Sequence, residues 1–486
     1  MFLIALLCVP LVATLITITT KKSYRLIEAV AFIASVLEAV FVVGLAGNFV
    51  QSASYQFAGY FAFDALSIYI LILISTVVFF TSWYAIGYFR KEVEKEIVGF
   101  RRVREFYALF HLCVFAMIVA VATINPIVFW IALEATSLAS VLLVSFYNKQ
   151  SGTEAAWKYL IINSLSLLLA FLGTVLLSAA VGTHGTGGIV TWESLALAAH
   201  YIDPMVAKIA FVFIFVGYGT KVGWVPLHTW KPDVYSKAPT PLVACMSSAF
   251  LALAWYGVLR FVLIGRAIGI GHFIDTSFLF FGICSVAVGA LIMLIQKNYK
   301  RFFAYSSIEH AGLLALGFGL GNAFGIYASL LHLLYHTLAK PLAFFGAGNI
   351  FLRYGTTKIA GVQGLSRVAP VTAIIFVFAC VTLMGLPPFG IFSSELTLIL
   401  AMFVSHPVVG AVVLLFLVIS FIATLRIGSL LLTGEPSREI AERAGRESSH
   451  AVLAPAVVLA VLLLVLSVWL PLWLLSLLQG ITTMFS

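Results

Sequence analysis

The chain has 486 residues, of which 62% are hydrophobic and only 10% are charged. A soluble domain of this length could not bury so much apolar surface, so the composition predicts an all-α polytopic membrane protein in contact with lipid. The net charge of +9 could suggest nucleic acid. In a membrane protein, however, such a charge reflects lysine and arginine collected on cytoplasmic loops, and we expect no nucleic-acid partner.

Fourteen apolar segments are long enough to cross a hydrocarbon core of about 30 Å. In chain order they are 2–20, 25–46, 64–88, 106–124, 127–147, 156–181, 205–225, 238–264, 276–296, 303–320, 323–351, 370–403, 407–433 and 452–478. Gly and Pro interrupt the seventh segment beside Lys221 and the twelfth just before Glu395, so we expect both helices to be broken. We also expect Pro341 to disturb the eleventh helix.

The positively charged residues of the loops lie almost entirely on one side of the predicted membrane. With the N-terminus outside, the inner loops carry nearly all the lysine and arginine that lie between segments, Lys231 and Lys300 included, whereas the outer loops carry Arg266 alone. This asymmetry predicts fourteen spans with both termini outside. The charge-rich inner loops 90–104 and 434–450 could contact anionic lipid or a cytoplasmic partner.

Ionisable side chains within the spans are functional candidates, because burying them in a membrane is costly. Lys221 fits a proton or ion site on a broken helix, although a lysine snorkelling from a helix end is the alternative. His332, His336 and Lys340 recur every four residues and therefore share one helix face. This row suits a proton relay, since histidine titrates near neutral pH, although structural histidines that bridge helices remain an alternative.

Cofactor and metal sites are not predicted in this chain. Its five cysteines lie singly in apolar runs, without a CxxC pair or a Cys/His cluster, so the sequence indicates neither an iron–sulfur site nor a disulfide framework. His332 and His336 have a spacing that metal ligands use, but their helix supplies no third ligand at a suitable offset. The remaining ionisable candidates are Glu134, Lys158 (four residues after Glu154), Glu309 and His310.

An internal repeat relates two parts of the chain. Glu134 and Glu309 are 175 residues apart, and Lys221 and Glu395 are 174 apart. Because five spans separate the members of each pair, the two units enter the membrane from opposite sides, which is typical of transporters. We expect a three-helix segment at 1–104, two inverted five-helix half-channels at 105–264 and 276–433, and a C-terminal loop and helix at 434–486.

The chain resembles a known family over most of its length, from the third span to the thirteenth. The matching stretches are FHLCVFAMIVAVATINPIVFWIALEATSLASVLLVSFY, EAAWKYLIINS, KRFFAYSSIEHAGLLALGFG and LLHLLYHTLAKPLAFFGAGNI. They are similar to the antiporter-like membrane subunits of respiratory complex I, Mrp-type sodium/proton antiporters and energy-converting hydrogenases. They look most like component F of hydrogenase-4-type complexes.

The resemblance implies a proton- or sodium-translocating subunit in a prokaryotic cytoplasmic membrane. Homologous antiporter-like subunits would lie beside it, and peripheral hydrogenase-like and iron–sulfur subunits would hold the nickel–iron and iron–sulfur centres. The chain itself has no redox site, so its own work would be limited to moving ions. Two alternatives remain open: a subunit of an Mrp-type antiporter without a redox arm, and a structural scaffold with an inactive channel.

The resemblance also implies roles for individual residues. Glu134 and Lys221 would form the ion pair of the first half-channel, with Lys158 as an adjoining relay residue. The His332, His336 and Lys340 row would carry charge along the central axis, and Glu395 would be the terminal ionisable group.

One departure from the family pattern lies in the eighth span. Many relatives have a lysine there, whereas this chain has Ala252. The relay between the two halves would therefore use Ser247, Ser248 or water, or would be impaired.

Overall fold

The computed structural model describes residues 2–52, 55–57, 59–182, 190–436, 440 and 449–485. Within these ranges eleven helical segments are long and apolar enough to cross a membrane. They are α1 (Phe2–Thr19), α2 (Tyr24–Ser52), α3 (Ala65–Glu94), α4 (Phe100–Ala122), α5 (Pro126–Val144), α6 (Gln150–Gly182), α8 (Pro204–Val222), α10 (Thr240–Met246) with α11 (Ala249–Ile268), α12 (Gly271–Ile295), α18 (Pro407–Leu432) and α20 (His450–Val468).

The other three expected segments also fall on helices. They are α13 (Tyr299–Gly319), α14 (Ala323–Tyr354) and the pair α16 (Pro370–Leu383) and α17 (Gly390–Ser405). α16 and α17 are each too short to be counted as a span alone. α13 and α14 carry most of the histidine, glutamate and lysine candidates, which lower their apolarity. Almost every residue of these two helices is buried, so protein rather than lipid surrounds them.

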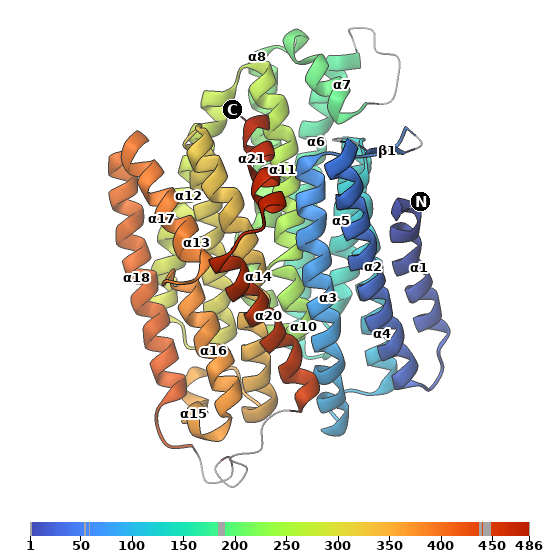
Figure 1. Cartoon of the computed structure of the whole chain (residues 1–486), viewed down its shortest axis with the longest axis vertical. Helices are drawn as coiled ribbons and strands as arrows, with labels where there is room; N and C mark the ends of the chain where they lie inside the picture. Colours follow the sequence, from blue (N-terminus) through green and yellow to red (C-terminus); the bar gives the residue numbers. More distant parts are fainter. Residues whose placement is uncertain are drawn as a thin grey trace.

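Short elements cover the two ends of the bundle (Figure 1). The antiparallel strands β1 (Tyr55–Phe57) and β2 (Phe61–Phe63) and the helix α7 (Trp192–Leu197) lie at the upper end, followed by the 3-10 turn η1 (Ala199–Tyr201). The helix α15 (Leu365–Val368) lies at the lower end, preceded by the 3-10 turn η2 (Ile359–Gly361). α1 begins and α21 (Leu472–Met484) ends toward the upper end, so the two chain ends share a side.

The structure confirms both expected helix breaks. α8 ends at Gly223, which has a φ of 89°, and α9 (Trp230–Lys237) follows. α16 and α17 are separated by residues 384–389, where Gly385 has a φ of 63°. Glycine adopts these left-handed conformations without the steric cost that other residues pay. α8 starts at the upper end and α16 at the lower end, so the two broken helices run in opposite directions (Figure 1).

The repeat is less regular than the sequence spacing suggested. Gly223 and Gly385 are 162 residues apart, which is shorter than the spacing of 174 between Lys221 and Glu395. Lys221 therefore precedes its break, whereas Glu395 follows its own. The two charged residues belong to corresponding broken helices but not to corresponding positions. The proposed boundaries of the half-channels stay a prediction.

Three helices differ from their expected form. α14 continues as one helix through Pro341, so the expected disturbance at this proline is wrong. A proline removes only one backbone donor, and the tight packing of α14 holds the helix together. The eighth span is divided at Ser247 and Ser248, between α10 and α11. The last span is divided before Pro471, between α20 and α21.

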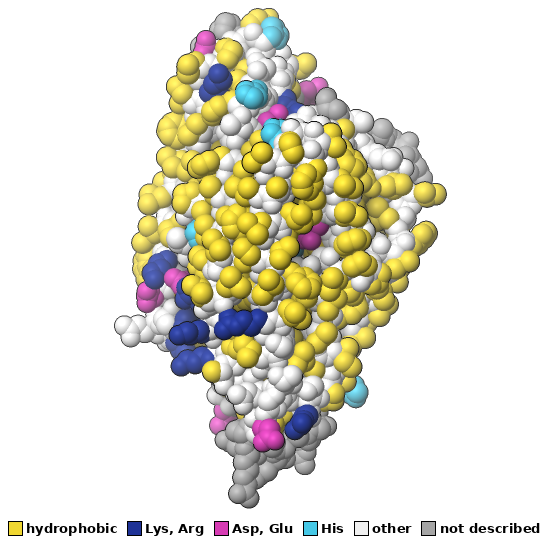
Figure 2. Space-filling view, turned by 90° about the vertical axis from the view of Figure 1, so that its left-hand side faces the viewer, with side chains coloured by type: hydrophobic (Ala, Val, Ile, Leu, Met, Phe, Trp, Pro, Cys, Tyr) yellow, Lys and Arg dark blue, Asp and Glu magenta, His cyan; other side chains and the backbone are white. Residues whose placement is uncertain are grey.

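The lipid-facing surface is apolar with basic residues below it. Figure 2 shows hydrophobic side chains across the middle of the face and most of the visible lysine and arginine gathered toward the lower end. This distribution agrees with the inner side being the lower one. Two lysines assigned to inner loops are, however, buried within the protein: Lys231 and Lys300. The inner loop 434–450 lies for the most part outside the described residues.

Candidate functional site: two clusters of buried charge

Lys221 is held by neutral hydroxyl groups. It lies at the end of α8, two residues before the chain turns at Gly223, and is only 4% exposed. Its Nζ donates hydrogen bonds to the Oγ of Ser137 on α5 and to the hydroxyl of Tyr159 on α6, the latter at 3.3 Å. These contacts satisfy an ammonium group away from water, as burial requires.

Glu134 does not form the expected ion pair with Lys221. Its Oε1 accepts a 2.6 Å hydrogen bond from Ser164 Oγ on α6. Its Oε2 is buried without a hydrogen-bond partner. Among the described residues no ion pair joins Glu134 to Lys221, because each group is bound by a serine of another helix instead. The carboxylate and the ammonium are therefore separate in this structure.

Lys158 lies at the inner rim rather than in the buried cluster. Its Nζ is 2.6 Å from Glu154 Oε1, which confirms that the two share a helix face, and 3.4 Å from Asp233 Oδ2. About half of its side chain (49%) is exposed. The neighbour of Lys158 in the chain, Tyr159, is the residue that reaches Lys221. The relay role of Lys158 stays a prediction.

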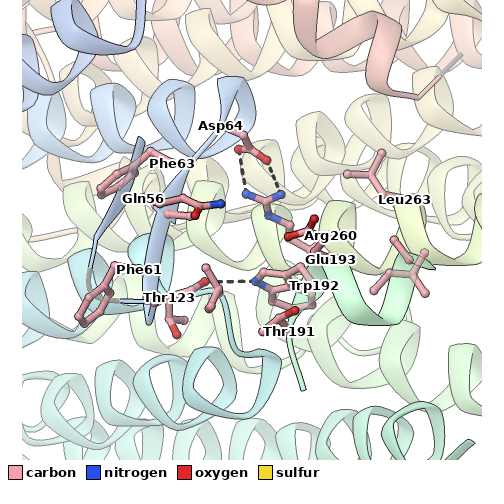
Figure 3. Close-up of a pocket in the computed structure, with 15 residues that line it drawn as sticks. Gln56, Phe61, Phe63, Asp64, Thr123, Thr191, Trp192, Glu193, Arg260 and Leu263 are labelled. Atoms are coloured by element: carbon pink, nitrogen blue, oxygen red, sulfur yellow. Dashed lines mark hydrogen bonds and ion pairs between the residues drawn. The ribbon is translucent and has the colours of Figure 1, made fainter. Parts of the chain in front are cut away.

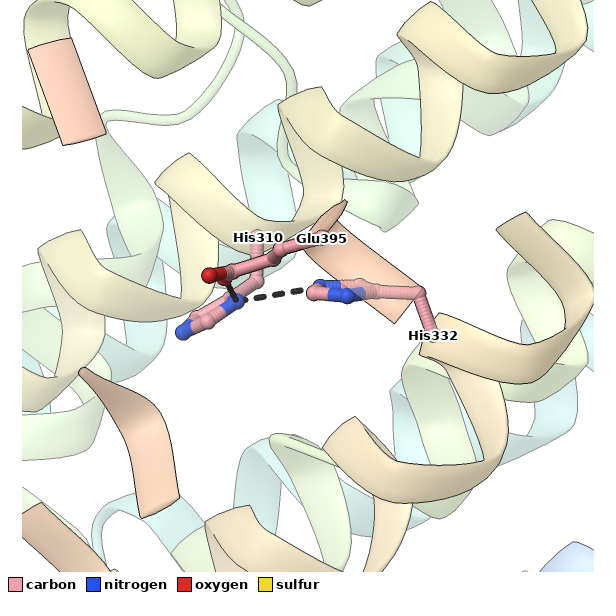
Figure 4. A group of neighbouring side chains, drawn as sticks. All are labelled: His310, His332 and Glu395. Carbon is pink, nitrogen blue, oxygen red and sulfur yellow. Dashed lines mark hydrogen bonds and ion pairs between the residues drawn. The ribbon is translucent and has the colours of Figure 1, made fainter. Parts of the chain in front are cut away.

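A second cluster joins side chains of three helices (Figure 4). His310 Nδ1 of α13 is 3.0 Å from His332 Nε2 of α14 and 3.9 Å from Glu395 Oε1 of α17. His332 Nδ1 is in turn 3.0 Å from Ser394 Oγ. Because one ring nitrogen faces another at hydrogen-bond distance, one must donate and the other accept. Such a contact is a direct path for a proton.

The cluster continues along α14 as the spacing of its polar residues predicted. The ring centroid of His336 lies 5.3 Å from that of His310, and both nitrogens of His336 lack a hydrogen-bond partner. Lys340 Nζ donates a 2.7 Å hydrogen bond to Ser306 Oγ of α13. Glu309 Oε2 lies 3.9 Å from His310 Nε2, and its charge acts on Lys340.

Three side chains from three different helices offer atoms of the kind that bind metal ions. His310, His332 and Glu395 offer ligand atoms that all lie within 4.8 Å of one another. Two imidazoles and a carboxylate are a set that transition metals use. In this structure, however, the facing ring nitrogens bind each other. The expectation of no metal stays a prediction.

Glycines at the two helix breaks make room for charged side chains. A Cβ added at Gly385 would collide with Glu395 Oε2, and one added at Gly223 would collide with the end of the Lys231 side chain. Lys231 is 1% exposed and donates a hydrogen bond to the carbonyl of Val222 at the end of α8. Its charge also acts on His336 and Lys340.

Sequence reasoning missed Lys231 because it follows a break and was read as part of an inner loop. The Trp-Lys-Pro run in which it lies was the available signal, since an aromatic residue and a proline flank it. Its burial places a lysine inside the bundle, beside the break that ends α8. Ser247 and Ser248 are buried at the α10–α11 break, and both donate to the carbonyl of Ala244.

A cavity of about 500 Å³ opens toward the outer end of the bundle. Figure 3 shows Asp64 facing Arg260 at one side of it, with hydrogen bonds of 2.5 and 2.8 Å between them. Burial would raise the pKa of Asp64, but the Arg260 charge and hydrogen bonds from Arg260 and Ser67 lower it overall. This pair was not singled out from the sequence.

Comparison with known proteins defines the class of the molecule. The transmembrane family described as NADH:quinone oxidoreductase/Mrp antiporter matches residues 123–423, which contain both clusters. The chain belongs to this family and is therefore a multi-pass, antiporter-like, ion-translocating membrane subunit.

Individual relatives agree with this assignment. The chain is 35% identical over 358 residues to a hydrogenase-4 component F homolog of Methylacidiphilum infernorum, covering 72% of this chain and 74% of the relative. Its fold matches a chain of an archaeal membrane-bound sulfane sulfur reductase, with a TM-score of 0.86, 22% identity and coverage of 99% and 97%. A chain of Thermus thermophilus respiratory complex I matches with a TM-score of 0.74, 26% identity and coverage of 96% and 97%.

Proposed function

We propose that this chain translocates protons, with sodium as the alternative ion, as a membrane subunit of a hydrogenase-4-type redox complex related to complex I. The observation that carries this proposal is the direct contact between titratable side chains in the second cluster. His310 lies within hydrogen-bond distance of His332 and 3.9 Å from Glu395, all of them buried between helices. Protons move along such a row without a water-filled pore.

The redox assignment rests on the relative that is a hydrogenase-4 component F homolog. Peripheral hydrogenase-like and iron–sulfur subunits would supply the electrons and hold the metal centres, and other antiporter-like subunits would lie beside this chain in the cytoplasmic membrane. An Mrp-type antiporter subunit would use the same two clusters without a redox arm. A scaffold with an inactive channel would have no need for a cluster of buried titratable groups, because their burial is costly.

Replacing Lys340 by methionine tests the translocation proposal. Methionine retains the length and apolar packing of the side chain but cannot bind a proton. We expect proton uptake by the reconstituted complex to fall on the order of 100-fold while the complex still assembles. Lys297→Met, at an exposed lysine before α13, is the matched control and should leave uptake unchanged. Normal uptake in Lys340→Met would refute the proposal.

The composition of the native complex distinguishes the two assemblies. Purification from the native membrane should yield a nickel–iron hydrogenase-like subunit and iron–sulfur proteins together with this chain. Copurification with Mrp-type antiporter subunits alone would instead select the alternative. A reporter joined after residue 485 should behave as periplasmic, because both chain ends lie at the end of the bundle opposite the basic loops. A cytoplasmic reporter would contradict this orientation.

A further inference from the structure

A buried carboxyl group lies outside both clusters and outside the part of the chain that the family matches. Glu92 is in the last turn of α3, in the N-terminal three-helix segment, and is fully buried. Glu94, two residues further on, is 60% exposed and pairs with Lys91 at 2.7 Å. An exposed position at a helix end is ordinary for glutamate, whereas full burial at the same end requires specific partners.

The partners of Glu92 form a directed chain of hydrogen bonds. Tyr147, which follows α5, donates from its hydroxyl to Glu92 Oε1 at 2.6 Å. The hydroxyls of Tyr147 and Tyr88 are 3.2 Å apart. A tyrosine has only one hydroxyl hydrogen, so Tyr147 must accept from Tyr88 while it donates to Glu92. The second carboxyl oxygen of Glu92 is buried without a hydrogen-bond partner.

Lysines of two other elements provide the charge that faces Glu92. The charges of Lys300 at the start of α13 and of Lys95 just after α3 both act on the carboxyl group. Lys300 is buried, and its Nζ donates to Thr240 Oγ1 at 3.0 Å. Lys95 donates to the carbonyl of Leu352 at the end of α14. Both lysines therefore place positive charge near the buried carboxyl group.

Lys300 lies on the helix that also carries the hydrogen-bond partner of Lys340. Lys300 precedes Ser306 by six residues on α13, which corresponds to about 9 Å along the helix axis. Ser306 is the hydrogen-bond partner of Lys340. Tyr147, the hydrogen-bond donor to Glu92, is only partly buried. Its side chain therefore connects Glu92 to the inner surface. The hydrogen bonds thus run from the inner surface to Glu92, and Lys300 begins the helix that carries Ser306 further into the bundle.

We propose that Glu92 is a proton-binding site at the inner end of the bundle, reached through Tyr147, from which protons enter the transport path. This inference rests on the proposed function for its role in transport, but proton binding by Glu92 itself does not. When Glu92 takes a proton, Tyr147 remains its donor and the free Oε2 becomes the protonated oxygen. When it releases that proton, the charges of Lys300 and Lys95 stabilise the carboxylate.

Infrared difference spectroscopy during a pH titration of the whole complex tests the site directly. A protonated carboxyl group has a carbonyl stretch that the carboxylate lacks. We expect Glu92→Gln to remove one such titrating band, and Tyr147→Phe to shift the frequency of that band because the carboxyl group loses a hydrogen bond. Glu94→Gln is the matched control on the same helix and should leave the band in place. A band pattern in Glu92→Gln identical to that of the unchanged complex would overturn the inference.

Proton uptake by the same variants separates this inference from the proposed function. Glu92→Gln should lower uptake from the inner side by about tenfold or more, the lower range for a missing proton carrier. Full uptake in Glu92→Gln, together with loss of uptake in Lys340→Met, would overturn only the role of Glu92 as the point of proton entry. Full uptake in Lys340→Met, with the Glu92 band present, would overturn the proposed function but leave the proton-binding site standing.

Discussion

The two clusters of buried charge each include a broken helix but hold their charged groups differently. In the first, Glu134 and Lys221 are bound by the neutral hydroxyls of Ser164 and Ser137 and are not paired with each other. In the second, ring nitrogens face one another directly at 3.0 Å. A proton can pass directly between facing ring nitrogens, whereas among the described residues no direct hydrogen bond joins Glu134 to Lys221.

This difference indicates different tasks. We propose that the second cluster forms a conducting row, because His332 and His310 are in direct hydrogen-bond contact and Glu395 lies 3.9 Å from His310, all three of them buried. We propose that the first acts as a switch, because a carboxylate and an ammonium that meet would hold each other charged, and separating them removes that stabilisation. Closure of the first pair during the transport cycle would then change the charge balance beside the second.

The largest effect is expected from breaking the conducting row at His332. This residue contacts both His310 and Ser394, so His332→Leu removes the middle of the row. We expect proton uptake by the reconstituted complex to fall on the order of 100-fold or more. His272→Leu, at an exposed histidine of α12, is the control. Uptake that remains within about threefold of the unchanged complex would show that protons bypass the row.

A double-mutant cycle tests whether the first cluster is a switch. Glu134→Gln and Lys221→Met should each lower uptake about tenfold or more, since each removes one half of the pair that must close. The double variant should be little worse than either single variant, because residues that act as one unit are non-additive. Uptake measured in vesicles for all three would show this. Losses that simply multiply would mean that the two residues act independently.

Sequence reasoning was most successful for features that depend on the residues within a single helix. The spacing of His332, His336 and Lys340 predicted their shared face, and the Gly/Pro runs predicted both broken helices. Each of these features depends on local sequence, through helical periodicity or through the backbone preference of glycine and proline.

Features that depend on contacts between distant helices could not be predicted in this way. No local pattern shows that Ser137 rather than Glu134 would bind Lys221, or that Tyr147 would reach Glu92. The burial of Lys231 and Lys300 was not predicted. A charged residue after an apolar run has the same sequence pattern whether it lies in an exposed loop or at a buried helix break. The continuity of α14 through Pro341 likewise depends on the helices packed around it.

Replacing one lysine-binding serine in each cluster compares the two clusters by the loss of a single hydroxyl group. Lys340 is bound by Ser306, whereas Lys221 is bound by both Ser137 and Tyr159. Ser306→Ala should therefore lower uptake about tenfold, and Ser137→Ala only about threefold, because a second acceptor, Tyr159, or a water can take over in the first cluster. The same vesicle assay measures both. Equal losses would contradict a difference between the two clusters.

The smallest effect is expected at Lys158. Its side chain is about half exposed and pairs with Glu154 and Asp233 at the inner rim, where water can replace either partner. Exposed ion pairs contribute little, about 0.2 to 1 kcal/mol, so Lys158→Met should change uptake by about twofold and leave assembly intact. Glu154→Gln, which removes the same pair from the other side, should give a similar small change. A loss in Lys158→Met as large as that in Lys221→Met would instead establish Lys158 as part of the relay, and the rim would then have to close around it during transport.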